Sequence, residues 1–486
     1  MADPSGSNHY DVAIIGAGII GSMIARELSR FEGRVALIEK EPAPGWGVSK
    51  GSLSMIHAPD FCPPGTLKGR LCVEAPARFK RLSEELEIAY REVDELWLAL
   101  EPSQIGAIED AKKRGESHGG TGFEIINGDE VRQLEPYVNP KVVAALYVRG
   151  LGVIHPPEWA FALVENAAQN GVQCHLNTEV LNIERDKEEG YLIQTSKGKF
   201  RARWIINAAG LYADEIASMV GDTGIQLTLT KGTMAIFDKS VSHLVRHMVY
   251  GTFSNRHSQA ITPTVHGNLL VGLGYFTAPE CKNDLKIESC GLKDMIRMGK
   301  ELIPCLSERD ILTTFTGIRS DNNQVPNGDF YIAPSSYSPG VIHAVIGQPG
   351  VTAAPAVSDY VIGLLTREGF ALNLKKSFQG KRKAWPVFSE ATLEEKGRLI
   401  QSNSTYGRLI CRCEQVTEGE IREAIRRGAD TLDAIKHLTR AGMGRCQGGE
   451  CEITISNLLV RQRGIPADRV TKKGRNSYQT KGSYAQ

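Results

Sequence analysis

Short apolar runs that end in small residues are the most regular pattern in this chain. The clearest run, Tyr10–Gly16, is followed by the helix-forming residues 22–28, and a second apolar run covers Arg34–Glu39. A third, Trp204–Gly210, has the same character. Continuous apolar runs of this length are typical of parallel strands that are covered on both faces. The order strand, helix, strand predicts an α/β fold class with a Rossmann-like domain.

A glycine pattern joins the first predicted strand to its helix. Gly16, Gly18 and Gly21 form a G-x-G-x-x-G sequence, and Glu39 ends the next strand 18 positions after Gly21. The first glycine permits a tight turn, the second lets a pyrophosphate approach the backbone, and the third lets helix and strand pack closely. The helix N-terminus then faces the phosphates, and Glu39 is expected to hold a ribose hydroxyl pair. The pattern predicts a dinucleotide site without choosing between NAD and FAD.

The remaining patterns predict several domains. A helix is expected over 157–170, with strands near 172–175, 178–184 and 191–195, whereas 80–150 and 220–315 mix amphipathic helices with alternating strands. We therefore expect a discontinuous dinucleotide-binding domain interleaved with an α+β substrate domain, and a small helical domain at the C-terminus. The expected limits are 8–80, 141–220 and 315–365 for the first domain, 81–140 and 221–314 for the second, 366–405 for a polar linker, 406–465 for the helical domain and 466–486 for a flexible tail.

Composition and charge exclude some classes of function. The 486 residues are 41% hydrophobic and 23% charged, as in globular proteins, and Lys+Arg 57 against Asp+Glu 56 leaves a net charge of +1. This balance gives no electrostatic case for a nucleic-acid groove. The N-terminus lacks the pattern of an export signal, and the apolar stretch 341–365 is interrupted by polar residues and prolines. We expect a cytoplasmic protein with no membrane span.

Four of the ten cysteines lie within the last 76 residues. These are Cys411, Cys413, Cys446 and Cys451, with 32 residues between the two pairs. Thr417 opens a capping box for a short helix between the pairs. Two thiolate pairs beside helix ends can ligate a small iron–sulfur cluster, and zinc or unliganded thiols are the alternatives. The absence of CxxC knuckles from these pairs favours the [2Fe–2S] cluster.

Several motifs, in this order, resemble the FAD-dependent glycine/D-amino-acid oxidase superfamily. They are the glycine fingerprint, the segments 47–58 and 64–68, Asn207–Asp214, Thr316–Arg319 and Gly347–Pro355. The most similar branch is the large subunit of anaerobic glycerol-3-phosphate dehydrogenases, with L-2-hydroxyglutarate dehydrogenases as near neighbours. The segment Thr439–Cys446 resembles the [2Fe–2S] domain of bacterioferritin-associated ferredoxin in the version fused to that branch.

The resemblance implies non-covalent FAD as the cofactor. It implies that a turn before a helix over 350–365 lies against the flavin ring, where the helix N-terminus can stabilise negative charge on the reduced flavin. The residues that it assigns to the cofactor, besides Gly16, Gly18, Gly21 and Glu39, are Lys40, Ser49, Lys50, Val180, Gly210, Gly347, Gly350, Val351 and Thr352.

Two residues are candidates for the chemistry. Arg319 is expected to bind an anionic substrate, because a guanidinium holds a carboxylate or phosphate in bidentate fashion; a structural arginine is the alternative. His57 is either an acid/base group or a hydrogen-bond donor to the flavin. The loop around Gly51 differs from the common pattern of the relatives, and Pro59 replaces their glycine, in the region where substrate would be sensed.

The leading hypothesis is a dehydrogenase that oxidises a small anionic substrate, with glycerol 3-phosphate as the named guess. The [2Fe–2S] cluster would pass electrons to a partner, such as a further flavoprotein or ferredoxin-like subunit, and peripheral membrane association would run through that partner. Alternatives are an L-2-hydroxy acid dehydrogenase, an amino or opine acid dehydrogenase, and an electron-relay or redox-sensing subunit without its own substrate.

Overall fold

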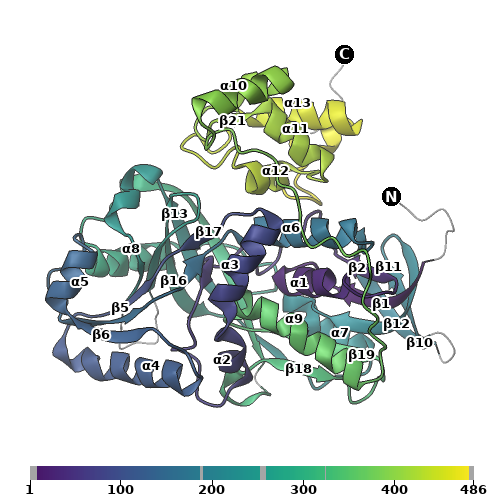
Figure 1. Ribbon diagram of the computed structural model, residues 1–486, viewed down its shortest axis with the longest axis horizontal. Helices are drawn as coiled ribbons and strands as arrows, with labels where there is room; N and C mark the ends of the chain where they lie inside the picture. The colour runs from purple at the N-terminus through teal and green to yellow at the C-terminus, as the bar shows by residue number, and fades with distance from the viewer. Residues whose placement is uncertain (1–7, 187–189, 252–258, 323, 481–486) are drawn as a thin grey trace.

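The computed structural model describes residues 8–186, 190–251, 259–322 and 324–480. Two eight-stranded sheets form the body of the molecule, and a small helical domain, drawn in yellow-green, lies above them in Figure 1. In the described residues, no helix is both long and apolar enough to cross a bilayer. The predicted mixed α/β architecture is confirmed.

The first sheet contains the predicted Rossmann-like unit. Its strands are, in spatial order, β10 (Val180–Asp186), β11 (Gly190–Thr195), β12 (Gly198–Asn207), β1 (His9–Ile15), β2 (Val35–Ile38) and β9 (Gln173–His175), while β19 (Val341–Val345) pairs with β12 and β18 (Tyr331–Pro334) with β19. β1 runs parallel to both β12 and β2. The strand predicted before Gly210 is therefore the direct neighbour of the strand before Gly16.

Both faces of this sheet are covered, which explains the unbroken apolar run in β1. Val12 and Ile14 pack beneath α1 (Ile19–Leu28), α6 (Pro156–Gln169) and α9 (Gly350–Arg367). Ala13 and Ile15 face the opposite core, which includes the side of α7 (Ala213–Met219). Successive residues of a strand point to opposite faces, so a strand covered twice needs apolar side chains at every position.

The second sheet carries the substrate-domain sequences. Its order is β17 (Ile311–Asn322), β13 (Leu227–Phe237), β16 (Leu269–Thr277), β15 (Gln259–Pro263), β14 (Met248–Gly251), β5 (Glu95–Ala99), β7 (Ala144–Val148) and β6 (Phe123–Asn127). Helices α5 (Gly128–Leu134) and α8 (Ser289–Leu302) lie beside one core of this sheet, and α4 (Ile105–Ser117) lies beside another. A small third sheet consists of β3 (Met55–Ile56), β8 (Gly152–Val153) and β4 (Arg91–Glu92). The helices α2 (Leu67–Cys72) and α3 (Ala75–Leu86) pack against α9, on the side of the first sheet.

Two expected domain limits differ from the structure. β7 and β17 belong to the second sheet, although 141–220 and 315–365 were assigned to the dinucleotide-binding domain. β7 pairs with β5 and β6, and β17 pairs along its length with β13. Local apolar patterns indicate that these segments are strands. They do not indicate which strand each one pairs with, because pairing depends on residues far away in the sequence.

The C-terminal domain is built from β20 (Leu409–Cys411), β21 (Val416–Thr417), α11 (Glu418–Arg426), α12 (Leu432–Thr439) and α13 (Glu452–Arg463). The Thr417 hydroxyl accepts a hydrogen bond from the Glu420 N–H, and the Glu420 side chain accepts one from the Thr417 N–H, so the capping box is confirmed. Residues 466–480 are folded onto this domain instead of forming a flexible tail. Val470 is buried in its core because the apolar faces of the short helices need a further cover.

The segment predicted as a linker is also more structured than expected. It contains α10 (Leu393–Ser402), opened by its own capping box at Thr392. Upstream of this helix, the Arg382 guanidinium is buried and donates to Glu165 at 2.5 Å and to the Leu86 carbonyl at 2.9 Å. This part of the segment is therefore fastened to α6 and α3.

Gly21→Ala tests the close packing of the β1–α1 turn. A Cβ at Gly21 would lie 1.9 Å from the carbonyl oxygen of Gly16, so the helix would have to move. We expect the free energy of unfolding to fall by about 1–3 kcal/mol, as in overpacked cores, and FAD content to fall with it.

The matched control is Gly363→Ala, at an exposed position of α9 where a Cβ meets no atom within 4 Å. This variant should unfold at the same or slightly higher denaturant concentration. Equal loss of stability in the two variants would contradict the account of the turn.

Candidate active site and cluster domain

The glycine turn and the end of β2 form one end of the site. Gly16 has φ +102°, which only glycine adopts easily, and the Ser49 hydroxyl accepts a hydrogen bond from the Ile19 N–H at 3.0 Å. The Glu39 carboxylate accepts hydrogen bonds from the Ala17 N–H at 2.7 Å and from the Glu41 N–H at 2.9 Å. Burial raises the pKa of Glu39. The predicted acidic residue therefore lies directly beside the glycine turn.

Other predicted cofactor residues lie along the same edge of the first sheet. The Lys40 ammonium is 3.2 Å from the centre of the Tyr212 ring, and Gly210, with φ +56°, begins the short helix that contains Tyr212. Val180 begins β10, and the preceding residue but one, Thr178, donates its N–H to the Glu39 carbonyl at 2.7 Å. The structure thus gathers these residues around the ends of β2, β10 and β12.

The N-terminus of α9 forms the other end of the site. Gly350, Val351 and Thr352 are its first residues, and Gly347 precedes them at the end of β19. The Thr352 hydroxyl accepts a hydrogen bond from the His57 N–H at 3.0 Å and donates to the Met55 carbonyl at 3.4 Å. The helix that the sequence placed against the flavin ring is therefore bonded to the loop that carries His57.

His57 has a buried side chain. Its Nδ1 is 2.9 Å from the Tyr250 hydroxyl oxygen, and its ring packs edge-on against Phe61 at a centroid distance of 5.1 Å. Burial lowers the pKa of His57 to about 4, so the imidazole is neutral at physiological pH. A neutral imidazole can accept a proton.

Arg319 lines a cavity of about 270 Å³ between the two sheets' elements. Phe61, Lys68, Asp321 and Gln348 share the lining, and the Arg319 guanidinium donates to the Gln348 side chain and lies 3.5 Å from an Asp321 oxygen. Burial lowers the pKa of Arg319. Lys68 and Gln348 were not predicted as site residues. Both are far from Arg319 in the sequence, and no local pattern connects either of them with the strand that carries Arg319.

Lys50 faces the C-terminal domain. Its ammonium is 4.0 Å from the centre of the Trp46 ring, and burial lowers its pKa, with the charges of Asp433 and Lys473 close enough to act on it. Lys50 is therefore at the boundary with the C-terminal domain, although the resemblance assigned it to the cofactor.

A group of three histidines lies at the same boundary. His155 precedes α6, His266 is in the turn between β15 and β16, and His437 is on α12. His155 Nε2 is 3.1 Å from His437 Nδ1, the two rings stack at 5.3 Å, and His266 Nε2 is 3.3 Å from a Glu158 carboxylate oxygen. Burial and nearby charges hold the pKa values of His155 and His437 well below the usual range. All three parts of the molecule meet at these imidazoles.

The four C-terminal cysteines come together as two pairs. The Cys413 and Cys446 sulfurs are 3.7 Å apart, and the Cys411 sulfur accepts a hydrogen bond from the Cys451 thiol, which lowers the pKa of Cys411 to about 6. Backbone N–H groups of Gly442 and Glu414 point to the Cys411 sulfur, and those of Gly448 and Glu450 to the Cys446 sulfur. Thiolate ligands with N–H donors fit an anionic iron–sulfur cluster.

Comparisons with known proteins agree with this division of the chain. Residues 11–364 match the family model described as FAD dependent oxidoreductase, and residues 409–461 match the BFD-like [2Fe-2S] binding domain. The second match supports the iron–sulfur cluster over zinc.

Individual relatives and a solved structure also match long parts of the chain. The chain is 37% identical to a glycerol 3-phosphate dehydrogenase of Caloramator mitchellensis over 473 residues, which cover 96% of this chain and 98% of the relative. It is 28% identical to a glycerol 3-phosphate oxidase of Mycoplasma pneumoniae, over 76% of this chain and 97% of the relative. A solved structure of L-alpha-glycerophosphate oxidase from Mycoplasma pneumoniae with FAD bound superposes with a TM-score of 0.72, covering 78% of this chain and all of that one.

The histidine group predicts an acid-sensitive fold. A histidine whose pKa is depressed in the folded state stabilises the protein fully above its unfolded pKa of 6.5, and the contribution falls as the pH drops below that value. For each such histidine, we expect the free energy of unfolding to fall by up to about 1.4 kcal/mol for each pH unit below the unfolded pKa. His437→Gln should reduce the fall in melting temperature between about pH 7.5 and about pH 5.5.

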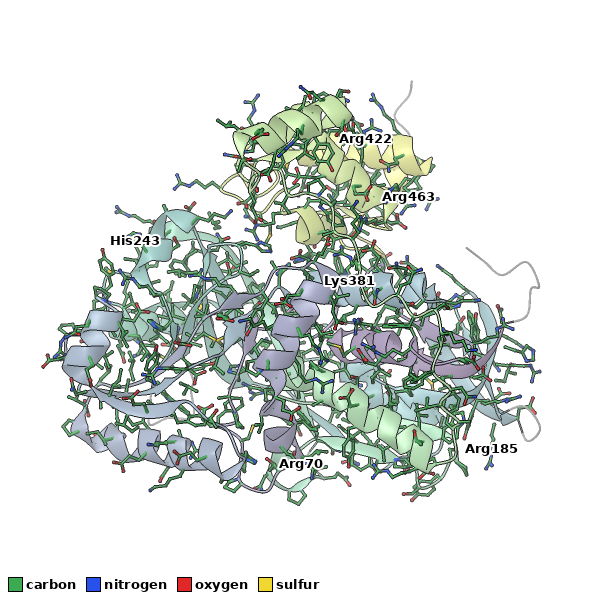
Figure 2. The ribbon with its side chains drawn as sticks, viewed as in Figure 1. Arg70, Arg185, His243, Lys381, Arg422 and Arg463 are labelled. Atoms are coloured by element: carbon green, nitrogen blue, oxygen red, sulfur yellow. The ribbon has the colours of Figure 1, made fainter. Side chains whose placement is uncertain are left out.

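His243→Gln is the control, because His243 is exposed on the second sheet's side of the molecule and is not one of the three clustered histidines (Figure 2). It should leave the acid dependence unchanged. If His437→Gln leaves the fall in melting temperature on acidification unchanged, the histidine group is not the cause of the acid sensitivity.

Cys446→Ser tests the cluster ligands. The unchanged protein, purified without oxygen, should carry about two irons per chain, and the variant should lose both the iron and the cluster absorption. FAD should stay bound, because its residues lie in another domain. Cys290→Ser, at an exposed cysteine outside the cluster domain, should keep both cofactors. Full iron content in Cys446→Ser, or stoichiometric zinc in the unchanged protein, would refute the ligand assignment.

Proposed function

The chain belongs to the FAD dependent oxidoreductase family and ends in a BFD-like [2Fe-2S] binding domain, and from this premise we propose that it is a dehydrogenase for a small anionic alcohol. Glycerol 3-phosphate is the substrate that we propose. The cavity beside Arg319 carries this proposal, because two cationic side chains, Arg319 and Lys68, line it. The names of two relatives, which cover 96% and 76% of this chain, support the same substrate class.

The described residues have separate tasks in this proposal. Arg319 binds the anionic group of the substrate, with Gln348 and Asp321 fixing the plane of its guanidinium. The Lys68 ammonium is held by the carbonyls of Asn327 and Gly328, at 3.0 and 2.9 Å, so it adds positive charge in a fixed place. His57 takes the hydroxyl proton of the substrate. FAD, when bound, accepts a hydride, and the [2Fe–2S] cluster accepts electrons one at a time.

Residues that would hold FAD are those gathered at the two ends of the site. The N-terminus of α1 suits the pyrophosphate, Glu39 the ribose, and the N-terminus of α9 the negative charge of the reduced ring. The fit rests on the close approach of Gly16 and Gly21, which leaves the backbone of the turn without side chains.

Electrons leave, in this proposal, through the C-terminal domain to a partner protein. The exposed Cys413 and the partly exposed Cys446 put one pair of cluster ligands near the surface, whereas Cys411 and Cys451 are buried. A further flavoprotein or a ferredoxin-like subunit would accept the electrons there. We propose that this protein is located in the cytoplasm, since thiolate ligands and free cysteines suit a reducing compartment.

Arg319→Ala tests the binding of an anionic substrate. It should weaken transition-state binding of glycerol 3-phosphate on the order of 2–5 kcal/mol, because it removes the partner of a charge in a partly desolvated site. Arg319→Lys should recover only part of the loss, since lysine lacks the planar fork. The measurement is the rate of flavin bleaching by substrate without oxygen, at several substrate concentrations.

Arg70→Ala is the matched control, because Arg70 is exposed on α2, two residues after Lys68 (Figure 2). Its flavin should be bleached at the unmodified rate.

A panel of L-2-hydroxy acids, amino acids and opines separates the alternative dehydrogenases, and a flavin that no substrate bleaches would favour the electron relay. Unchanged bleaching in Arg319→Ala would return Arg319 to a structural role.

A further inference from the structure

A buried polar cluster lies behind His57. Asp60 comes from the same loop, Glu95 from β5 and Tyr250 from β14. β5 and β14 are parallel neighbours, with Trp97 opposite Tyr250, so the second sheet brings Glu95 and Tyr250 to one place. Asp60 is 0% and Glu95 2% exposed, and such burial of two carboxyl groups needs a physical reason.

The contact between His57 and Tyr250 favours one form of the imidazole. The Tyr250 hydroxyl oxygen is 2.9 Å from His57 Nδ1 and 3.3 Å from the Met55 sulfur. With the hydroxyl proton directed at the sulfur, the Tyr250 oxygen accepts the Nδ1 proton, and the Glu95 Oε2 atom, 4.0 Å from Nδ1, favours the same form. Nε2 then carries the lone pair, and in the described part of the chain it has no hydrogen-bond partner. The imidazole is thus arranged to accept a proton at Nε2.

The carboxyl pair lies near the same nitrogen. A Glu95 oxygen, Oε2, is 4.0 Å from His57 Nδ1, and Glu95 and Asp60 are close enough for each to act on the pKa of the other. A hydrogen bond between the two carboxyl groups would require one proton. Among the described residues, neither Asp60 carboxyl oxygen has a conventional donor, so a shared proton is what relieves the repulsion of two buried charges. One negative charge remains on the pair.

Burial agrees with this division of charge. It raises the pKa of Asp60 to about 7 and that of Glu95 well above its usual range. Arg114 lies near enough to lower the pKa of Asp60, and its guanidinium donates to the Asp60 carbonyl at 2.8 Å. Burial therefore favours a pair that retains one proton.

The buried polar residues around His57 are next to the proposed substrate cavity, and Phe61 lies between them. The Phe61 ring contacts His57 and also lines the cavity with Arg319. The His57 backbone is fixed to Thr352 at the start of α9. His57 is thereby held between the cavity, the cofactor helix and the carboxyl pair.

We infer that Tyr250 and the Asp60–Glu95 pair are positioning residues for His57, which keep its Nδ1 protonated and place a negative charge beside the imidazolium formed when Nε2 takes the substrate's hydroxyl proton. This inference rests on the proposed function. In the step, the substrate O–H bond breaks and an Nε2–H bond forms, while the C–H electron pair leaves as hydride to FAD and the alcohol becomes a ketone. The pair itself gains and loses nothing; it lowers the energy of the imidazolium, as a buried aspartate does for the histidine of a catalytic triad.

Tyr250→Phe and Glu95→Gln test the inference in the complete protein. In Tyr250→Phe, flavin bleaching by saturating glycerol 3-phosphate should slow about 10- to 100-fold, while the substrate concentration for half-maximal rate changes less than about 2-fold. In Glu95→Gln, the rate should fall and the pH at which it is half-maximal should move down, because a less stabilised imidazolium is a stronger acid. Tyr147→Phe is the control, since Tyr147 donates to Asp94 on the same sheet outside the cluster.

A second measurement does not depend on turnover. Infrared spectra of the protein, with and without FAD, should contain the carbonyl band of a protonated carboxyl at neutral pH. Glu95→Gln and Asp60→Asn should each remove or shift it, and Tyr147→Phe should not.

The outcomes separate this inference from the proposed function. If the unchanged protein is bleached but Tyr250→Phe and Glu95→Gln keep its rate and pH profile, the positioning role is wrong. If the band is unaffected by both carboxyl substitutions, the shared proton is wrong. If no hydroxy substrate bleaches the unchanged protein, the proposed function fails, whatever the infrared spectra show.

Discussion

The loop from Gly47 to Ala58 must touch three parts of the fold at once. Ser49 bonds to the first turn of α1, and His57 bonds to Thr352 at the start of α9. Between them, Gly51 meets Gly317 of β17 so closely that a Cβ on Gly317 would lie 2.1 Å from the Gly51 carbonyl oxygen. Only glycine at both positions permits this contact. The glycine turn, the cofactor helix and the strand of Arg319 are therefore placed relative to one another by a single loop.

The contact between the two glycines gives a physical reason for Gly51, a residue at which the sequence differs from its relatives. Gly51 stands within the stretch that differs from the common family pattern, and the structure assigns it a backbone contact with the second sheet. A substitution there would move the loop away from β17. It would thereby change the distance between His57 and the Arg319 cavity.

What could be predicted from the sequence is what short segments determine. The strand–turn–helix at Gly16, the capping box at Thr417 and the position of Glu39 beside the turn depend on neighbouring residues, and all three are present in the structure. The sheet membership of β7 and β17, the burial of Val470 and the junction contacts of Lys50 depend on residues far away in the chain. The same holds for Lys68 in the cavity and for Glu95 behind His57, since no local pattern marks an acidic residue as buried.

The cluster domain is attached to the body by both apolar and charged contacts. Ala43 and Phe161 from the body enter its hydrophobic core, while Arg427 pairs with Glu165 at 2.8 Å and Arg445 with Asp238 at 2.6 Å. With the buried histidines at the same boundary, these contacts hold the domain against the side of the molecule that carries Trp46 and Lys50. A docked arrangement of this kind suits two redox centres that act in sequence within one chain.

The central claim is that the flavin and the iron–sulfur cluster act in sequence within one chain, and its most direct test follows both centres in one experiment. The protein is mixed with glycerol 3-phosphate without oxygen, flavin bleaching is recorded by absorbance, and reduction of the cluster is recorded by electron paramagnetic resonance on frozen samples. The account predicts that the flavin is bleached first and that the cluster signal then rises without any added partner. A flavin that is bleached while the cluster stays oxidised, or a cluster that is reduced before the flavin, would contradict it.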